Sequence, residues 1–112
     1  MEAKAITRYA RYSPKKVAQI LKLIRKKRVD EVFAILKFLN KGCVDLVEKT
    51  LKSALANAGG LREPFRFYIK ECWVNKGPYL KRIRPRAFGR ANIYTRKMCH
   101  LTIIVSDEKP KE

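Results

Sequence analysis

Apolar residues recur in the first half of the chain at the spacing of an α-helix. The apolar positions between 17 and 24 stand at i, i+3, i+4 and i+7, which form one stripe on a helix. They are Val17, Ile20, Leu21 and Ile24. Ser13 and Pro14 precede the stripe, and Ser is a preferred N-cap while Pro fits the first helical position. The pattern predicts a helix that begins at 13–14 and buries this stripe.

Two further segments show the same spacing. One opens with Asp30 and Glu31, acids that the helix dipole favours in a first turn. The next spans about 43–58 and ends before Gly59-Gly60, which favours a left-handed helix stop. The expected buried faces are Val32, Ile35, Leu36 and Leu39 in one helix, and Val44, Val47, Leu51, Ala54, Leu55 and Ala58 in the other.

Alternating patterns at both ends of the chain predict β-strands. Residues 3–12 partly alternate, with Ile6, Ala10 and Tyr12 on one parity. The segments FRFYIKECWVN and CHLTIIVS have the same β character, and Trp73 is expected in the core. Strand, three helices and then two strands predict an α+β fold, with three helices packed on a three-stranded antiparallel sheet.

Length and charge narrow the function. The chain has 112 residues, which suits one domain, and carries 27 Lys and Arg against 10 Asp and Glu, a formal charge of +17. Ten basic residues and one acid lie in 1–28, and eight basic residues with no acid lie in 76–97. The centre is nearly neutral. Such a charge predicts a polyanionic partner, either nucleic acid or an anionic membrane surface.

The second basic block predicts a hairpin. If Gly77-Pro78 leaves the sheet and RAFGR forms the turn, each arm has about ten residues and reaches about 30 Å. A ribbon with so many like charges is marginal alone, so we expect it to become ordered among phosphates. Tyr79, Phe88 and Tyr94 are interleaved and could stack on unpaired bases. We therefore expect one domain, 1–112, with 77–98 as a protruding hairpin.

Candidate chemistry beyond RNA binding is sparse. Cys43, Cys72 and Cys99 are an odd number and lack the paired spacing of a disulfide framework, which favours a reducing compartment. Together with His100 they could supply four zinc ligands, but the chain has no CxxC pair of the kind that zinc sites use. The chain has no carboxylate pair, phosphate-binding glycine loop or nucleophile motif. We therefore expect that the protein is not an enzyme and that it binds no cofactor and no metal ion. The absence of a signal peptide or long apolar run favours a soluble intracellular protein.

Five motifs then occur in the order typical of one family. The chain resembles the large-ribosomal-subunit protein twenty-two family, in its bacterial or organellar form, along nearly its whole length. The motifs are SPKK (13–16), KSALANA (52–58), KGP (76–78), KRIRPRAFGRA (81–91) and CHLTIIV (99–105). The resemblance implies a structural constituent of the large subunit that binds its rRNA, supports assembly and lines the polypeptide exit tunnel with its hairpin.

The resemblance also implies site residues and partners. The hairpin tip, Arg86, Ala87, Phe88, Gly89 and Arg90, would approach the tunnel constriction. The implied partners are large-subunit rRNA, neighbouring ribosomal proteins near the exit tunnel and the nascent polypeptide, with no membrane and no homo-oligomer. The implied location is the cytoplasmic ribosome, or the stroma or matrix of an organelle. The expected rRNA-binding residues are Arg11, Ser13, Lys15, Lys16, Lys81, Arg82, Arg84, Arg86, Arg90, Arg96 and Lys97.

One departure from the family and three other functions bear on this interpretation. Lys26 stands where the family commonly has Gly, which predicts a different or extended end of the first helix. A DNA-architectural protein with a basic β-arm would share the charge, but it normally needs a dimer to supply two arms. A membrane-surface helix over 14–28 is a weaker alternative, because its stripe is better explained as core. An RNA-processing enzyme would need an acid-base set that the chain lacks.

Overall fold

The structure is a computed structural model that describes residues 2–39, 42–78, 80–85, 89 and 91–108. Within the strands of the basic hairpin it describes the backbone. The elements in chain order are β1 (Glu2–Ala10), α1 (Pro14–Ile24), α2 (Val29–Phe38), α3 (Val44–Asn57), a 3-10 turn η1 (Pro64–Arg66), β2 (Tyr68–Lys76), β3 (Leu80–Pro85), β4 (Ala91–Arg96) and β5 (Cys99–Ser106).

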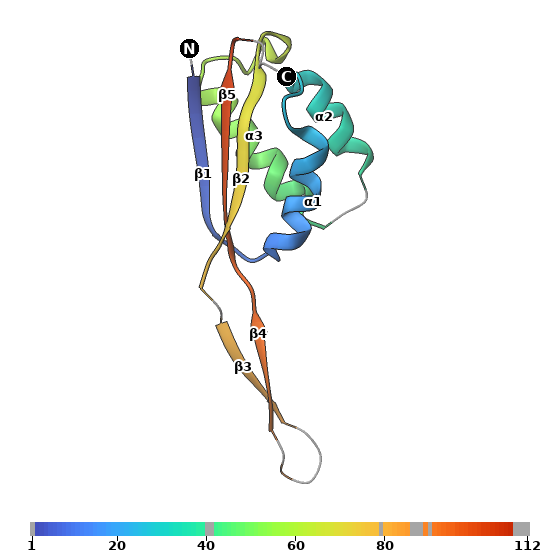
Figure 1. Ribbon diagram of the computed structural model, residues 1–112, viewed down its shortest axis with the longest axis vertical. Helices are drawn as coiled ribbons and strands as arrows, with labels where there is room; N and C mark the ends of the chain where they lie inside the picture. The colour runs from blue at the N-terminus through green and yellow to red at the C-terminus, as the bar shows by residue number, and fades with distance from the viewer. Residues whose placement is uncertain (1, 40–41, 79, 86–88, 90, 109–112) are drawn as a thin grey trace.

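The sheet is antiparallel, with β5 at its centre. The strand order is β1-β5-β2, so the last strand lies between the first two and pairs with both. The three helices cover one face of this sheet (Figure 1). The predicted α+β fold of three helices on a three-stranded antiparallel sheet is confirmed.

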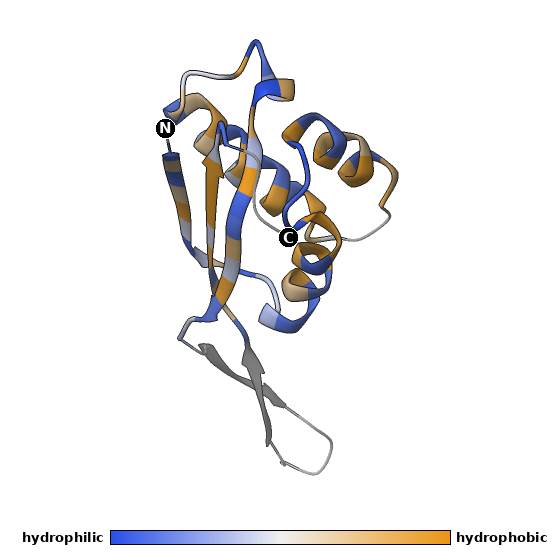
Figure 2. Ribbon diagram, turned by 45° about the horizontal axis from the view of Figure 1, so that its top comes forward, coloured by the Kyte–Doolittle hydropathy of each residue, from blue (hydrophilic) through white to orange (hydrophobic). Residues whose placement is uncertain are grey.

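The core fills the space between the helices and this face. All four residues of the α1 stripe are buried, as are Leu101, Ile103 and Val105 of β5. Figure 2 shows β5 as the most continuously hydrophobic strand, as expected of a central strand. In α2 the buried positions include Val32 and Leu36, while Ile35 is half-buried and Leu39 lies just beyond the helix. Periodicity alone therefore located most of the core.

The helix ends follow backbone conformation. Gly59 follows α3 with φ +74°, the left-handed stop that its position predicted. Helix α1 ends at Ile24, and Lys26 takes φ +59° two residues later. Of the two expectations for this helix end, different or extended, the extended end is wrong: Lys26 adopts the left-handed conformation that glycine adopts at lower cost. In the described part of the chain, every helix is too short or too polar to cross a bilayer.

A β-bulge interrupts β1 near its end. Thr7 pairs with Leu101 and Ala10 pairs with Cys99, so Arg8 and Tyr9 together lie opposite His100. Because of the extra residue, odd-numbered side chains face the core before the bulge and even-numbered ones face it after the bulge. Ala5 points into the core before the bulge and Ala10 packs against the core after it. Ile6, which shares parity with Ala10 in the sequence, therefore lies on the outer face and is 40% exposed.

Trp73 also lies on the outer face of the sheet. Its neighbour Cys72 is buried, and the Cys72 thiol donates to the carbonyl of Leu21 in α1 at 3.9 Å. Because side chains alternate along a strand, Trp73 points away from the helices, and it is half-buried opposite Thr102 of β5. The expectation that Trp73 belongs to the core is wrong.

Strands β3 and β4 form a separate two-stranded antiparallel ribbon beyond the end of the main sheet (Figure 1). Their register runs from Leu80 opposite Arg96 to Pro85 opposite Ala91. At the base of the ribbon the Gly77 N–H donates to the Met98 carbonyl at 2.9 Å. The assignment of 77–98 as a protruding part of a single domain stays a prediction.

Candidate nucleic-acid interface

Four of the expected rRNA-binding residues meet at one end of the helix-and-sheet part of the molecule. Arg11 follows β1, Lys15 and Lys16 lie in the first turn of α1, and Lys97 joins β4 to β5. All four are exposed. The β1–α1 connection and the base of the ribbon lie at the same end of the main sheet (Figure 1). We call these four residues the basic end.

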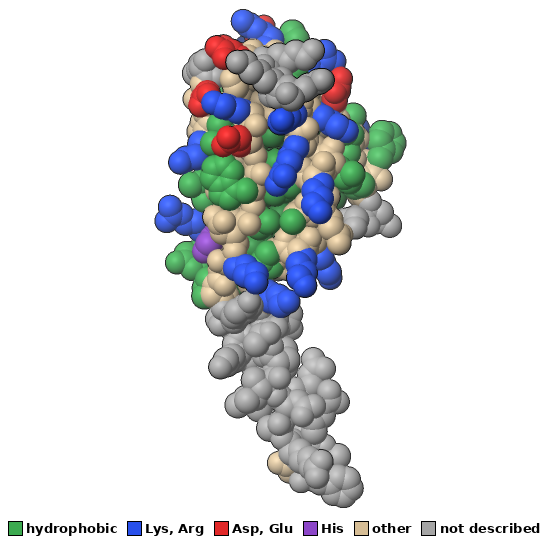
Figure 3. Space-filling model, in the orientation of Figure 1, with side chains coloured by type: hydrophobic (Ala, Val, Ile, Leu, Met, Phe, Trp, Pro, Cys, Tyr) green, Lys and Arg blue, Asp and Glu red, His purple; other side chains and the backbone are tan. Residues whose placement is uncertain are grey.

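Within the described residues, no acidic side chain neutralises the charge of the basic end. No described carboxylate lies within ion-pair distance of any of the four residues, whereas Arg28, Lys52, Arg66 and Lys70 each pair with an acid. Figure 3 shows Asp and Glu side chains toward the end away from the ribbon, and Lys and Arg side chains reaching the ribbon base. Unpaired, exposed cations keep their full attraction for phosphate.

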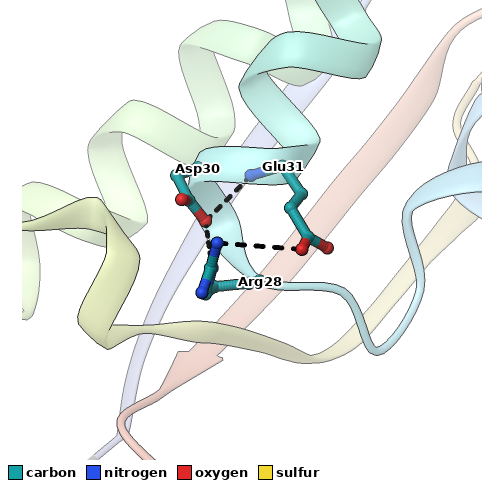
Figure 4. A network of polar contacts seen from close by, with 3 residues as sticks. All are labelled: Arg28, Asp30 and Glu31. Carbon is teal, nitrogen blue, oxygen red and sulfur yellow. Dashed lines mark hydrogen bonds and ion pairs between the residues drawn. The ribbon is translucent and has the colours of Figure 1, made fainter.

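Arg28 belongs to the same basic sequence block but has a different role (Figure 4). Its Nε donates to Oδ1 of Asp30 at 2.6 Å, and its Nη2 lies 3.8 Å from Oε1 of Glu31. The same Asp30 oxygen accepts the backbone N–H of Glu31 at 2.9 Å. The hydrogen bond to Asp30 raises the pKa of Arg28. Arg28 therefore fixes the start of α2, which its charge alone could not reveal.

Ser13 occupies the predicted N-cap position of α1. Its backbone is extended, and its carbonyl accepts the N–H of Val17 at 3.2 Å. Its side chain forms no capping hydrogen bond, so the helix begins at Ser13 and Pro14 without using the hydroxyl. That hydroxyl, half-buried beside the basic end, stays available to an outside acceptor.

The remaining expected contacts lie on the ribbon. The register places Lys81 opposite Thr95, Arg82 opposite Tyr94 and Arg84 opposite Asn92, while Arg96 faces Leu80. Arg86, Ala87, Phe88 and Arg90 lie outside the described residues. Gly89 has φ +72°, a left-handed conformation suited to a turn. The rRNA-binding and tunnel-tip assignments stay predictions.

The cysteines are buried, free thiols: Cys43 immediately precedes α3, Cys72 lies in β2 and Cys99 lies in β5. Burial raises the pKa of Cys72 and of Cys99. Within the described residues, no group of three or more His, Cys, Asp and Glu could hold a metal ion. Cys99 is fully buried, whereas His100 lies on the other face of β5, against Tyr9.

The comparison with known families decides what this basic protein is. The family of ribosomal protein L22p/L17e matches residues 5–106 of the chain. The chain belongs to this family. Curated relatives named large ribosomal subunit protein uL22 include that of Endomicrobium trichonymphae, 50% identical with 96% of this chain and 93% of the relative covered. That of Pelotomaculum thermopropionicum is 46% identical, covering 97% of this chain and 98% of the relative. That of Staphylococcus haemolyticus is 48% identical, covering 97% of this chain and 95% of the relative.

Membership of the L22p/L17e family resolves the alternatives that the charge left open. The family resemblance inferred from the five motifs is confirmed, and it selects a ribosomal protein over a DNA-architectural one. The family consists of structural proteins, so the expectation that the chain is not an enzyme is also confirmed. The membrane-helix alternative fails on the fold, because the apolar stripe of α1 is buried in the core.

Proposed function

We propose that this protein is a structural constituent of the large ribosomal subunit that holds rRNA on two basic surfaces. The first is the basic end and the second is the β3–β4 ribbon. The observation that carries the proposal is that four exposed cations, none with a carboxylate partner among the described residues, gather at the end from which the ribbon extends (Figure 1). Neutralised phosphates release counterions, which makes binding tight at low salt and steeply salt-dependent.

Salt titration of rRNA binding tests this surface. We expect the triple variant Arg11→Ala, Lys15→Ala, Lys16→Ala to bind protein-free large-subunit rRNA more weakly. The slope of log K against log salt should fall by about 3, roughly one for each lost phosphate contact. The matched control removes Lys37, Lys49 and Lys52, exposed lysines of α2 and α3. Equal slopes for the two variants would overturn the assignment of the basic end.

The ribbon would carry the second part of the function. On the family resemblance, the ribbon extends along the exit tunnel, and its tip, 86–90, lies beside the nascent polypeptide. Neighbouring ribosomal proteins near the tunnel would be further partners. A photoreactive phenylalanine in place of Phe88 should cross-link to a stalled nascent chain in assembled ribosomes. The same group placed at Phe38, an exposed residue at the end of α2, should not.

A further inference from the structure

Tyr9 has an unusual backbone and an unusual exposure. Its φ is +57°, in the left-handed region that is sterically unfavourable for a residue with a Cβ. The residue is nevertheless 61% exposed, so burial of the ring does not compensate for this conformation. Strained residues of this kind concentrate at functional sites, and β-bulges often re-aim a side chain there. The bulge returns Ala10 to the core, but the exposed ring of Tyr9 calls for an explanation other than core packing.

His100 holds Tyr9 in place through two contacts. The Tyr9 backbone N–H donates to Nδ1 of His100 at 3.0 Å, and the two rings pack edge to face with centroids 4.9 Å apart. Because Nδ1 is the acceptor, the neutral imidazole carries its proton on Nε2. In an edge-to-face pair, at least one face of the tyrosine ring is left uncovered by the histidine. His100 thus orients Tyr9 while most of the residue stays exposed.

The surroundings of Tyr9 are cationic. Arg8 shares the bulge, Arg11 follows two residues later, and both are exposed. Neither is joined to a carboxylate within the described structure. An exposed aromatic ring with cations nearby in the chain is the combination that binds unpaired nucleotides, since the base stacks on the ring and the phosphates contact the arginines. A protein partner would have no comparable need for two exposed arginines without a described carboxylate partner so close to the ring in sequence.

We propose that Tyr9 is a stacking platform for an unpaired rRNA base, and that His100 is its positioning residue. This inference rests on the proposed rRNA-binding function and adds a base-recognition site to it. The bulge and the hydrogen bond to His100 preorganise the Tyr9 ring in the free protein, so little conformational freedom is lost when rRNA binds. Arg8 and Arg11 contribute contacts to the phosphates that flank the stacked base.

Binding of protein-free large-subunit rRNA to the full-length chain tests the platform. Tyr9→Ala should weaken binding by about 5- to 150-fold, the range expected for one stacked base. Tyr9→Phe should retain affinity near wild type, whereas Tyr9→Leu, which keeps apolar bulk without a ring, should not. The salt slope should stay unchanged in all three, because no phosphate contact is lost. Phe38→Ala, at an aromatic residue that is 87% exposed on α2, is the matched control and should bind like wild type.

A double-mutant cycle tests the positioning role. His100→Leu removes the acceptor of the Tyr9 N–H, so it should weaken rRNA binding, and combining it with Tyr9→Ala should cause little further loss. Melting curves verify that each variant is folded at the assay temperature. Folded Tyr9→Ala protein that binds rRNA as tightly as wild type would overturn the inference. If the losses in affinity of the two single variants add fully in the double variant, the positioning role of His100 is overturned. Failure of the wild-type chain to bind rRNA would instead overturn the proposed function.

Discussion

The hydroxyl groups of Thr7 and Thr50 lie 2.6 Å apart at the interface between β1 and α3. Thr50 Oγ1 also donates to the carbonyl of Leu46 at 2.9 Å, so its single proton is already used. The Thr7 hydroxyl must therefore donate to Thr50 Oγ1. Thr50 is 1% exposed, and this chain of two hydrogen bonds ties the edge strand that leads to the basic end onto the longest helix.

We expect Thr50→Val to lower the free energy of unfolding by about 1–3 kcal/mol, because Val matches the shape of Thr but leaves the Thr7 hydroxyl without its acceptor. The melting temperature should fall by roughly 4–8 °C per kcal/mol. Ser53→Ala, at an exposed position of the same helix, is the control and should change little. A Thr50→Val protein as stable as wild type would show that the hydrogen bond contributes nothing.

Lys26→Gly should raise the free energy of unfolding by up to about 1 kcal/mol. Lys26 has φ +59°, which glycine adopts without the steric cost that a Cβ imposes. The same substitution at Lys22, an exposed position inside α1, should instead destabilise by about 1 kcal/mol, because glycine is a poor helix former. Thermal unfolding of the two variants side by side provides the measurement. Destabilisation of both by the same amount would contradict the left-handed conformation of Lys26.

The buried thiols should resist alkylation in the folded protein. Burial is the largest cause of the raised pKa of Cys72, and the hydrogen bond from Arg25 offsets only part of it. Because the thiolate is the reactive form, iodoacetamide at pH 8 should label Cys72 and Cys99 slowly, and guanidinium should restore labelling at the rate of an ordinary thiol. Rapid labelling of either residue without denaturant would contradict the packing.

The raised thiol pKa also favours the folded state at neutral pH, and this contribution to stability should be lost as the pH rises through the pKa of the buried thiols.

Deletion of 82–96 should leave the rest of the protein folded. The described core is built from α1, α2, α3 and the three strands of the main sheet, and the Gly77–Met98 hydrogen bond lies below the deleted segment. A variant with a short Gly-Ser turn in its place should keep a cooperative melting transition while binding rRNA more weakly. Loss of cooperative melting in the deletion variant would contradict this account of the core.

In the intact free protein, the backbone amide hydrogens of the ribbon should exchange quickly with solvent and become protected when rRNA binds.

Much of the fold was predictable because its signals are local. The α1 stripe, the alternation of Leu101, Ile103 and Val105, and Gly59 after α3 each correspond to one element or one stop in the structure. The bulge at Arg8 and Tyr9 was not predictable, since neither residue favours a left-handed conformation and only pairing with β5 creates the extra residue. The error for Trp73 has a similar origin, because its face of the strand depends on the register with Thr102.

The candidate site was predictable in location but not in detail. Charge counting found the basic block at the start of the chain, yet it could not separate Arg28, which pairs with Asp30, from Arg11, which has no described partner. That distinction depends on where the start of α2 comes to lie. The contact between Tyr9 and His100 joins residues 91 positions apart, and no local signal in the sequence links them.

Sedimentation through a sucrose gradient tests the central claim most directly, that the basic end attaches this protein to large-subunit rRNA. A tagged wild-type chain should migrate with the large ribosomal subunit and stay there through a moderate-salt wash. The variant without the cations of Arg11, Lys15 and Lys16 should be lost from that fraction in the same wash, while the Lys37, Lys49 and Lys52 control should remain. Migration of the wild-type chain at the top of the gradient, or with DNA, would contradict the account.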